Sequence, residues 1–426
     1  MRKNFLWYNF IRLGVVRTGL KFFYKRIRII DKHKIPKGKP ILLVPNHQNS
    51  FMDALLVTTH FYKTTSFLTR AQAFESKFMD WFLRSLNLLP VYRVRDGMSN
   101  IQKNNEIFET CINYLSNNEA VLVFAEANHD LKRRLRPFSK GFTRIAFDAE
   151  IKNNWNLDLY VQPVGVNYSD HQNSRNEVRV VFGDPIKVSD YKKEYEQDER
   201  SAANSLKNQT SENLKPLIMH VPKLDQYPLI KIALDEMEPD RAKLANNQYM
   251  NQLVEYAEEL QTPELISDAE YVIEVSEKNN LSIRTLADVK LPMVKRILLA
   301  PIYLLVWLNG IIPYQPARFI IKNKIKDKAF DVSIKFVLGL FLFPLFYLLV
   351  TGILLIAGVP AIWAWGYFFI SLFTSTMFKR ANELVRSLKE KKKIREFHQS
   401  DSEAFNILKT RIANIANFRK LVINGE

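Results

Sequence analysis

The chain has 426 residues, which is long enough for two or three domains. Its 61 Lys and Arg residues against 44 Asp and Glu residues give a net charge of +17, which indicates an anionic partner such as nucleic acid or an anionic membrane surface. The single cysteine, Cys111, excludes an internal disulfide and any cysteine-based metal cluster.

Residues 1–26 predict an amphipathic helix that lies in a membrane interface. Aromatic and basic residues interleave through MRKNFLWYNFIRLGVVRTGLKFFYKR, and Arg12, Arg17 and Lys21 interrupt its apolar runs. The segment has no small-residue cleavage site, so it does not fit a signal peptide. Interleaved aromatic and basic residues are typical of helices at a membrane surface, and packing as an ordinary amphipathic helix against the protein is the alternative.

Residues 27–190 predict an α/β domain in which helices flank a layered sheet. Short runs of β-branched and apolar residues alternate there with helical stretches, which argues for a sheet with helices packed on it. The predicted strands are 27–30, 41–45, 66–69, 88–92, 120–124, 159–166 and 178–182, and helices are predicted at 52–62 and 104–116.

The stretch PNHQNSFMD places His47 and Asp53 directly after the apolar run ILLV. Six positions apart, the two side chains cannot meet within one strand or one helix. They meet only if a strand ends near His47 and a helix begins before Asp53, and a His–Asp pair at such a corner is typical of general-base catalysis. The pattern Ser50-x-x-Asp53 also fits a helix start, which would explain Asp53 without a catalytic role.

Polar and cationic residues also follow two other predicted strands, and we interpret five of them as candidate substrate-binding residues. They are Arg93, Glu126, Asn128, His129 and Lys140. Because the strand ends of one sheet tend to converge, we expect a carboxylate beside several cationic groups, which suits a small phosphorylated substrate. The basic residues 132–136, taken one by one, are more typical of a solvated face.

The sequence lacks the common motifs of metalloproteases, serine hydrolases and nucleotide-binding proteins. The chain contains no HExxH, GxSxG, P-loop or GxGxxG sequence. A metal site built from His47, Asp53, Glu126 and His129 is an alternative, but the spacing of these residues matches no common metal motif. We therefore expect no metal.

The C-terminal half predicts membrane segments within residues 294–378. No charged residue occurs from 336 to 378, about twice the ~20 residues needed to cross a bilayer. Gly358 and Pro360 divide this run, which predicts a two-span hairpin. Proline and glycine also interrupt the shorter run 297–317, so a re-entrant or interfacial segment and a full crossing are both open there.

Two polar regions complete the organisation. Residues 191–293 predict a polar helical region, and residues 379–426 predict a basic helical tail. Basic residues flank every apolar run. Since positive residues mark the cytoplasmic side, we expect hairpin-like membrane segments with the α/β domain and the tail on the cytoplasmic side.

Residues 27–188 resemble the glycerolipid acyltransferases, the superfamily of lysophospholipid and glycerol-phosphate acyltransferases. NHQNSFMD is similar to the first block of that family, Asn-His-x-Ser-x-x-Asp, and LLPVYR is similar to the second block, whose arginine corresponds to Arg93. VFAEANHD resembles the third block, Phe-Pro-Glu-Gly-Thr-Arg-Ser, and VQPVGV resembles the fourth, which is centred on a proline, here Pro163.

Two departures from the family pattern are informative. Five residues separate His47 from Asp53, where the family usually has four, so the turn must be one residue longer and the His–Asp distance is open. Ala127 replaces a glycine of the third block. EANHD looks like the Glu-Gly-Gly-Ser-His-Asp version of some glycerol-3-phosphate acyltransferases, which favours glycerol-3-phosphate as the acceptor.

The resemblance implies a membrane-bound enzyme without a cofactor that moves a fatty acyl group from acyl-CoA or acyl-carrier protein to glycerol-3-phosphate. His47 would take a proton from the acceptor hydroxyl while Asp53 holds the imidazole. Arg93 would bind the phosphate, and Glu126 would position the free hydroxyls of the acceptor. A lysophospholipid acceptor, or a non-catalytic lipid-binding protein of the same fold, are the alternatives.

The basic residues cluster beside apolar spans, where anionic lipid headgroups account for them. We therefore expect anionic membrane lipids and no nucleic acid among the partners. Bacterial family members resemble this chain most in arrangement, which favours a bacterial inner membrane.

Overall fold

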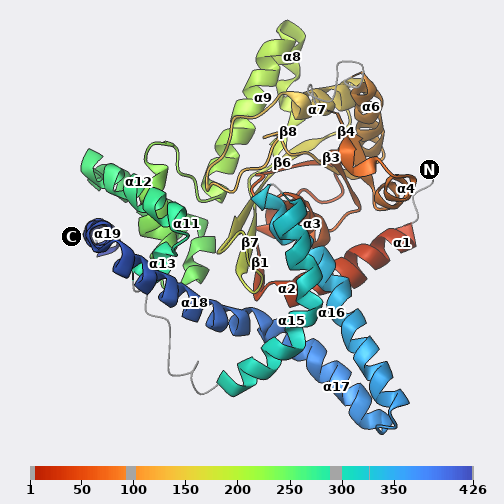
Figure 1. Ribbon diagram of the computed structural model, residues 1–426. Helices are drawn as coiled ribbons and strands as arrows, with labels where there is room; N and C mark the ends of the chain where they lie inside the picture. Colours follow the sequence, from red (N-terminus) through yellow and green to blue (C-terminus); the bar gives the residue numbers. More distant parts are fainter. Residues whose placement is uncertain (1–4, 93–101, 288–299, 326, 425–426) are drawn as a thin grey trace. The chain divides into compact units, whose positions relative to one another are not determined.

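The structure of the chain is a computed structural model with two compact units (Figure 1). It describes residues 5–92, 102–287, 300–325 and 327–424. Unit 1 comprises Met1–His171 and Glu177–His220, and unit 2 comprises Gln172–Asn176 and Val221–Glu426.

Unit 1 is built on one mixed sheet. The spatial order of its strands is β1 (Arg26–Ile30), β7 (Glu177–Phe182), β6 (Tyr160–Tyr168), β2 (Ile41–Pro45), β5 (Ala120–Leu122), β3 (Thr65–Arg70) and β4 (Leu88–Val91), and β8 (Ile186–Lys187) pairs with β6. From β6 to β4 all neighbours are parallel, whereas β7 runs antiparallel to β6. The predicted α/β fold class is confirmed, and the short strand β8 is the one the pattern missed.

Helices cover both faces of the sheet, which explains why β2 is buried along its whole length. Leu42 and Val44 point to the face that α6 (Lys103–Ser116), α7 (Gly141–Lys152) and α9 (Glu199–Leu214) cover. Residues Met52 to Thr59 of α3 (Phe51–His60) are all buried, and α3 contacts β6. Cys111 of α6 is part of the core, as expected of a small apolar side chain.

After the sheet, unit 1 continues through α8 (Lys192–Gln197) and α9. The segment after α9, which contains Leu217, then crosses over β6. Gly165 lies in β6 where the backbone of Leu217 crosses it, and a Cβ at position 165 would overlap the Leu217 carbonyl group. Asn167 supports the same crossing: its amide donates to the Leu217 carbonyl at 2.8 Å and accepts from the backbone N–H of Met219 at 3.0 Å. The crossing therefore requires glycine at position 165.

The polar part of unit 2 is a group of helices packed by apolar stripes. The last helix, α19 (Ser402–Asn424), buries Leu408, Ile412, Ile415, Phe418 and Val422, which recur every three or four residues along one face. This face contacts α11 (Asn247–Leu260) and α12 (Pro263–Lys278). A partly buried ion pair between Arg419 and the buried Glu238, at 2.8 Å, fixes the helix on this unit.

Two helical stretches of unit 2, Lys328–Ile356 and Ala361–Ser400, are long and apolar enough to cross a membrane. Little of either apolar stretch is buried, unlike the core helix of a soluble protein. Gly358, at φ +81°, lies in the turn between α16 (Asp331–Ile356) and α17 (Ala361–Thr374), so the uncharged run forms two helices.

The run 297–317 falls largely in one continuous helix, α15 (Ala300–Lys324). Its Asn309 bonds to two side chains of α17, donating to Ser371 at 3.0 Å and accepting from Tyr367 at 2.8 Å. Hydrogen bonds of this kind hold helices together where no water competes. The geometry is that of a third helix beside the hairpin.

Replacing Gly165 by alanine is expected to destabilise unit 1 by about 2 kcal/mol, because the added methyl group displaces the Leu217 backbone. Thermal unfolding at one scan rate should show a lower apparent Tm by several degrees. Gly141→Ala is the matched control, since the nearest atom to its Cβ, in Phe108, lies 4.0 Å away. Equal Tm values for the two variants would contradict the close approach.

Candidate active site

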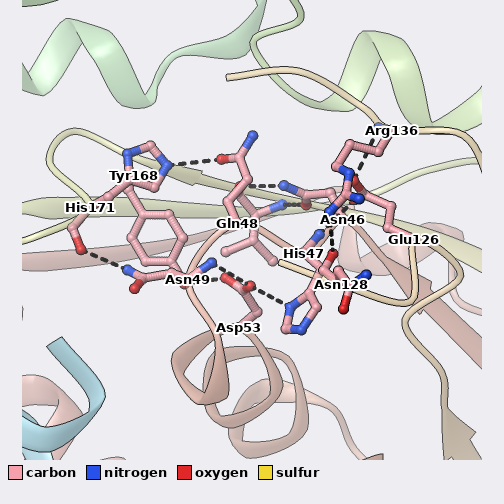
Figure 2. A network of polar contacts seen from close by, with 11 residues as sticks. Asn46, His47, Gln48, Asn49, Asp53, Glu126, Asn128, Arg136, Tyr168 and His171 are labelled. Atoms are coloured by element: carbon pink, nitrogen blue, oxygen red, sulfur yellow. Dashed lines mark hydrogen bonds and ion pairs between the residues drawn. The ribbon is translucent and has the colours of Figure 1, made fainter. Parts of the chain in front are cut away.

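The site forms where the parallel strands β2, β5 and β6 end side by side. His47 follows β2, Glu126 follows β5, and Tyr168 is the last residue of β6. Figure 2 shows these side chains converging from the three strand ends. Asn46 fixes the exit of β2, because its side-chain amide pairs with both the N–H and the C=O of Val166 in β6, at 2.7 and 3.1 Å.

The His47 and Asp53 side chains meet as the strand–turn–helix corner requires. The distance from Nδ1 of His47 to Oδ2 of Asp53 is 3.0 Å. Asp53 is fully buried in the first turn of α3, and His47 remains partly accessible, with 13% of its side chain exposed. With Nδ1 engaged, Nε2 is the ring nitrogen that has no protein partner among the described residues, so it is available to accept a proton.

The longer turn between the two residues is accommodated at three positions. Ser50 takes a φ of +47°, and its side chain makes no capping hydrogen bond, so the helix-start alternative for Asp53 does not describe the turn. The side chains of Gln48 and Asn49 bond instead to His171, at its ring (2.9 Å) and its carbonyl (2.9 Å). The fifth residue is thus absorbed without separating His47 from Asp53 (Figure 2).

The carboxylate of Asp53 also receives two hydrogen bonds that the sequence did not predict. The backbone N–H of Asn49 donates to Oδ2 at 2.7 Å, and the hydroxyl of Tyr168 donates to Oδ1 at 2.6 Å. With His47, three donors surround this buried carboxylate. They compensate its removal from water and fix which oxygen faces the imidazole.

Glu126 holds the backbone around His47. Its Oε1 accepts the backbone N–H of His47 at 2.7 Å, and its Oε2 accepts the backbone N–H of Arg136 at 3.0 Å. The backbone N–H of Asp130 donates to the His47 carbonyl at 3.1 Å, so the loop after β5 binds the His47 peptide on both sides. Burial raises the pKa of Glu126 to about 8, against the opposite effect of the two backbone donors and the Arg136 charge.

Two aromatic rings also pack against the imidazole of His47. It stacks on Phe124, with ring centroids 3.8 Å apart, and meets the edge of His129 at 5.5 Å. Burial lowers the pKa of His47, and the charges of His129 and Arg70 lower it further, whereas the hydrogen bond and charge of Asp53 raise it. A lowered pKa keeps the imidazole neutral, the form that accepts a proton, at neutral pH.

The structure brings four of the predicted site residues together: His47, Asp53, Glu126 and His129. Asn128 lies beside them, exposed, with its carbonyl accepting from Arg136 at 3.2 Å. Lys140 is exposed at the residue before α7. Arg93 lies outside the described residues. Among the described residues no group of three or more His, Cys, Asp and Glu side chains is placed to hold a metal ion.

Several neighbours of the site were not predicted. Tyr168 and Arg70 both stand at strand ends, so the strand-end rule extended to every strand would have found them. Arg133 was interpreted as part of a solvated face, which is wrong: it is buried and donates to the Tyr168 carbonyl at 2.8 Å. Ala127 takes a φ of +61°, which explains why a glycine suits this position.

Comparison with known proteins identifies the segment that carries this site. Residues 26–167 match the family described as Acyltransferase. A segment of 115 residues is 25% identical to glycerol-3-phosphate O-acyltransferase 2 of Saccharomyces cerevisiae, covering 24% of this chain and 16% of that protein. The crystal structure of the 1-acyl-sn-glycerophosphate (LPA) acyltransferase PlsC from Thermotoga maritima has a TM-score of 0.36 and 18% identity, over 50% of this chain and 83% of that one.

The matched segment contains β1 to β5, all of β6 except its last residue, and the His47–Asp53 pair. The predicted resemblance to the glycerolipid acyltransferases is confirmed at the level of this family. The chain matches less than a fifth of the length of the yeast relative.

Replacing Tyr168 by phenylalanine keeps the ring and removes one donor from Asp53. The negative charge then acts more strongly on the imidazole, so we expect the pKa of His47 to rise by about 0.5–1. NMR titration of isotope-labelled histidine measures this value. Tyr24→Phe is the matched control, because the buried Tyr24 hydroxyl has no hydrogen-bond partner among the described residues. Equal titration curves for both variants would argue against a role for Tyr168 in positioning Asp53.

Proposed function

We propose that the chain is a membrane-bound O-acyltransferase that moves a fatty acyl group from an acyl thioester to glycerol-3-phosphate, with His47 as the general base. The observation that carries this proposal is the 3.0 Å contact between His47 and Asp53 at the strand ends of an acyltransferase domain. A non-catalytic lipid-binding protein would have no need of this contact, and a separation well beyond ~4 Å would have favoured it.

In the proposed reaction the acceptor hydroxyl approaches Nε2 of His47. Nε2 takes the proton as the hydroxyl oxygen attacks the thioester carbonyl, and Asp53 stabilises the imidazolium that forms. Collapse of the tetrahedral intermediate breaks the C–S bond, and the imidazolium returns the proton to the leaving thiolate. The products are an ester and a free thiol, and no covalent acyl-enzyme is required.

Cationic groups near His47 suit a phosphorylated acceptor. Arg70, at the end of β3, acts on His47 through its charge, and Arg136 lies on the loop that Glu126 holds. Arg93, Asn128, His129 and Lys140 stay proposed binding residues beside them. Glu126 uses both oxygens for backbone N–H groups, so we propose that it positions the base as well as the acceptor.

Glycerol-3-phosphate is the proposed acceptor because EANHD resembles a glycerol-3-phosphate acyltransferase block and the yeast relative bears that name. A monoacyl glycerol phosphate is the second candidate. The donor is acyl-CoA or acyl-carrier protein. We further propose that the C-terminal hairpin anchors the chain with its acyltransferase domain on the cytoplasmic side of a bacterial inner membrane, where anionic lipids meet its basic flanks.

The test is an acyl-transfer assay on purified full-length protein in nanodiscs. The labelled donor is acyl-CoA or acyl-carrier protein, and the acceptor is glycerol-3-phosphate or lysophosphatidic acid. We expect product from glycerol-3-phosphate and a loss of about 10²–10⁴-fold in kcat for His47→Ala. His33→Ala, which removes an exposed histidine, should keep full activity. Product from lysophosphatidic acid alone would reassign the acceptor, and no product with either donor class would overturn the enzyme proposal.

The pH dependence tests the state of the base. Because the pKa of His47 is lowered, kcat/KM should rise with pH and level off below ~6.5, the ordinary histidine value. Asp53→Asn removes the group that raises the pKa, so the acidic limb should move to still lower pH while the plateau falls. A limb that stays above ~6.5 in the unsubstituted protein would contradict a buried neutral His47 as the base.

A further inference from the structure

Helix α4 (Lys77–Ser85), which connects β3 to β4, turns its aromatic side chains away from the domain. Phe78 and Trp81 are 66% and 50% exposed, and Leu83 is the residue of this helix that is buried. The ring of Phe78 lies 6.2 Å from that of Trp81 and 6.0 Å from that of Phe82. Spacings of three and four residues put all three rings on one helix face. A helix of a soluble domain turns such a face to the core.

A second aromatic element lies beside α4. The N-terminal helix, formed by α1 (Phe5–Asn9), η1 (Phe10–Val16) and α2 (Arg17–Phe23), is joined to the last turn of α4 by a hydrogen bond from the Trp7 indole to the Ser85 hydroxyl, at 3.1 Å. Figure 1 shows α1 and α4 as neighbours on unit 1. The most exposed apolar side chains of this helix are Phe5, Leu6 and Phe10.

The N-terminal helix is fixed to the sheet, so its exposed side chains are presented by a rigid support. The Tyr8 hydroxyl donates to the Thr65 carbonyl at 3.1 Å, and the Arg12 guanidinium donates to the Lys63 carbonyl at 2.6 Å. Tyr8 and Leu20 are buried against the domain. One face of the helix therefore packs on unit 1 while another leaves large apolar side chains in the open.

We propose that the outward face of α4 and the exposed side of the N-terminal helix form one docking surface for an anionic lipid bilayer. Residues 5–24 contain the exposed Arg17 and Lys21 and no acidic residue, which suits anionic headgroups. Tryptophan and phenylalanine are the side chains that favour the bilayer interface. The same chain carries two helices able to span a membrane, so unit 1 is tethered within reach of a bilayer.

Docking through α4 would fix the distance between the bilayer and the candidate active site. Helix α4 begins a few residues after the end of β3, whose last residue, Arg70, acts on His47 through its charge. A bilayer held against α4 therefore lies at a fixed offset from the strand ends that carry His47. The sequence predicted residues 1–26 at the membrane interface and made no such prediction for α4. The proposed role of α4 is independent of which acceptor the site uses.

The test places an environment-sensitive fluorophore at position 78 or 81, through Phe78→Cys or Trp81→Cys, in the full-length protein. The native Cys111 is buried, and labelling of the unsubstituted chain gives its background. Glu196→Cys on α8 is the control, because that carboxylate is exposed elsewhere on unit 1. The proteins are reconstituted in nanodiscs of phosphatidylcholine and phosphatidylglycerol, with or without lipids brominated near the headgroup end of the acyl chain.

We expect blue-shifted emission at both test positions and bromine quenching severalfold greater than at position 196, since interfacial side chains insert roughly 5–10 Å below the headgroups. Emission at 78 and 81 equal to that at 196 would overturn the proposal. Blue-shifted emission without bromine quenching would also overturn it, because protein rather than lipid would then cover α4. Two separately labelled positions guard against one variant that fails to fold, and the readout needs no turnover, so it stands apart from the acyltransferase assay.

Discussion

The site depends on one fully buried carboxylate. Removing the charge of Asp53 from water costs several kcal/mol unless hydrogen bonds replace those lost. The chain supplies three donors, the Asn49 backbone, the His47 ring and the Tyr168 hydroxyl. Two of them belong to the turn after β2, and the third belongs to β6. The carboxylate therefore joins the turn to the sheet, and the same bonds that make its burial tolerable aim the imidazole.

A second set of bonds fixes the main chain of His47 from the opposite side. The β5 loop contributes the Glu126 carboxylate to its N–H and the Asp130 N–H to its carbonyl, and Phe124 packs on its ring. In the proposed role of general base His47 must keep its direction, and both its backbone and its side chain are held. Together these contacts leave Nε2 as the ring nitrogen with no protein partner among the described residues.

The sequence predicted those features of the site that depend on neighbouring residues in the chain. Strand patterns predicted the sheet, and the impossibility of a His–Asp contact within one element predicted the corner that the structure contains. The strand-end rule could have placed Tyr168 near the site, but not its contact with Asp53. That contact depends on the pairing of β2 with β6, which lie far apart in the chain. The burial of Arg133 was missed for a related reason. In the sequence Arg133 belongs to a run of basic residues, and only the fold shows that its guanidinium reaches the Tyr168 carbonyl.

The pattern of apolar residues along a helix also does not predict what covers its apolar face, as α3 and α4 of unit 1 show. Both helices are rich in apolar residues, yet α3 buries every residue from Met52 to Thr59, whereas α4 buries Leu83 and exposes Phe78 and Trp81. A pattern shows that a helix has an apolar face and not which medium covers that face. This chain also contains two helices able to span a membrane, so an apolar surface outside the core can be covered by lipid instead of protein. In the proposed docking, exposure that would destabilise a soluble domain places the site against the bilayer.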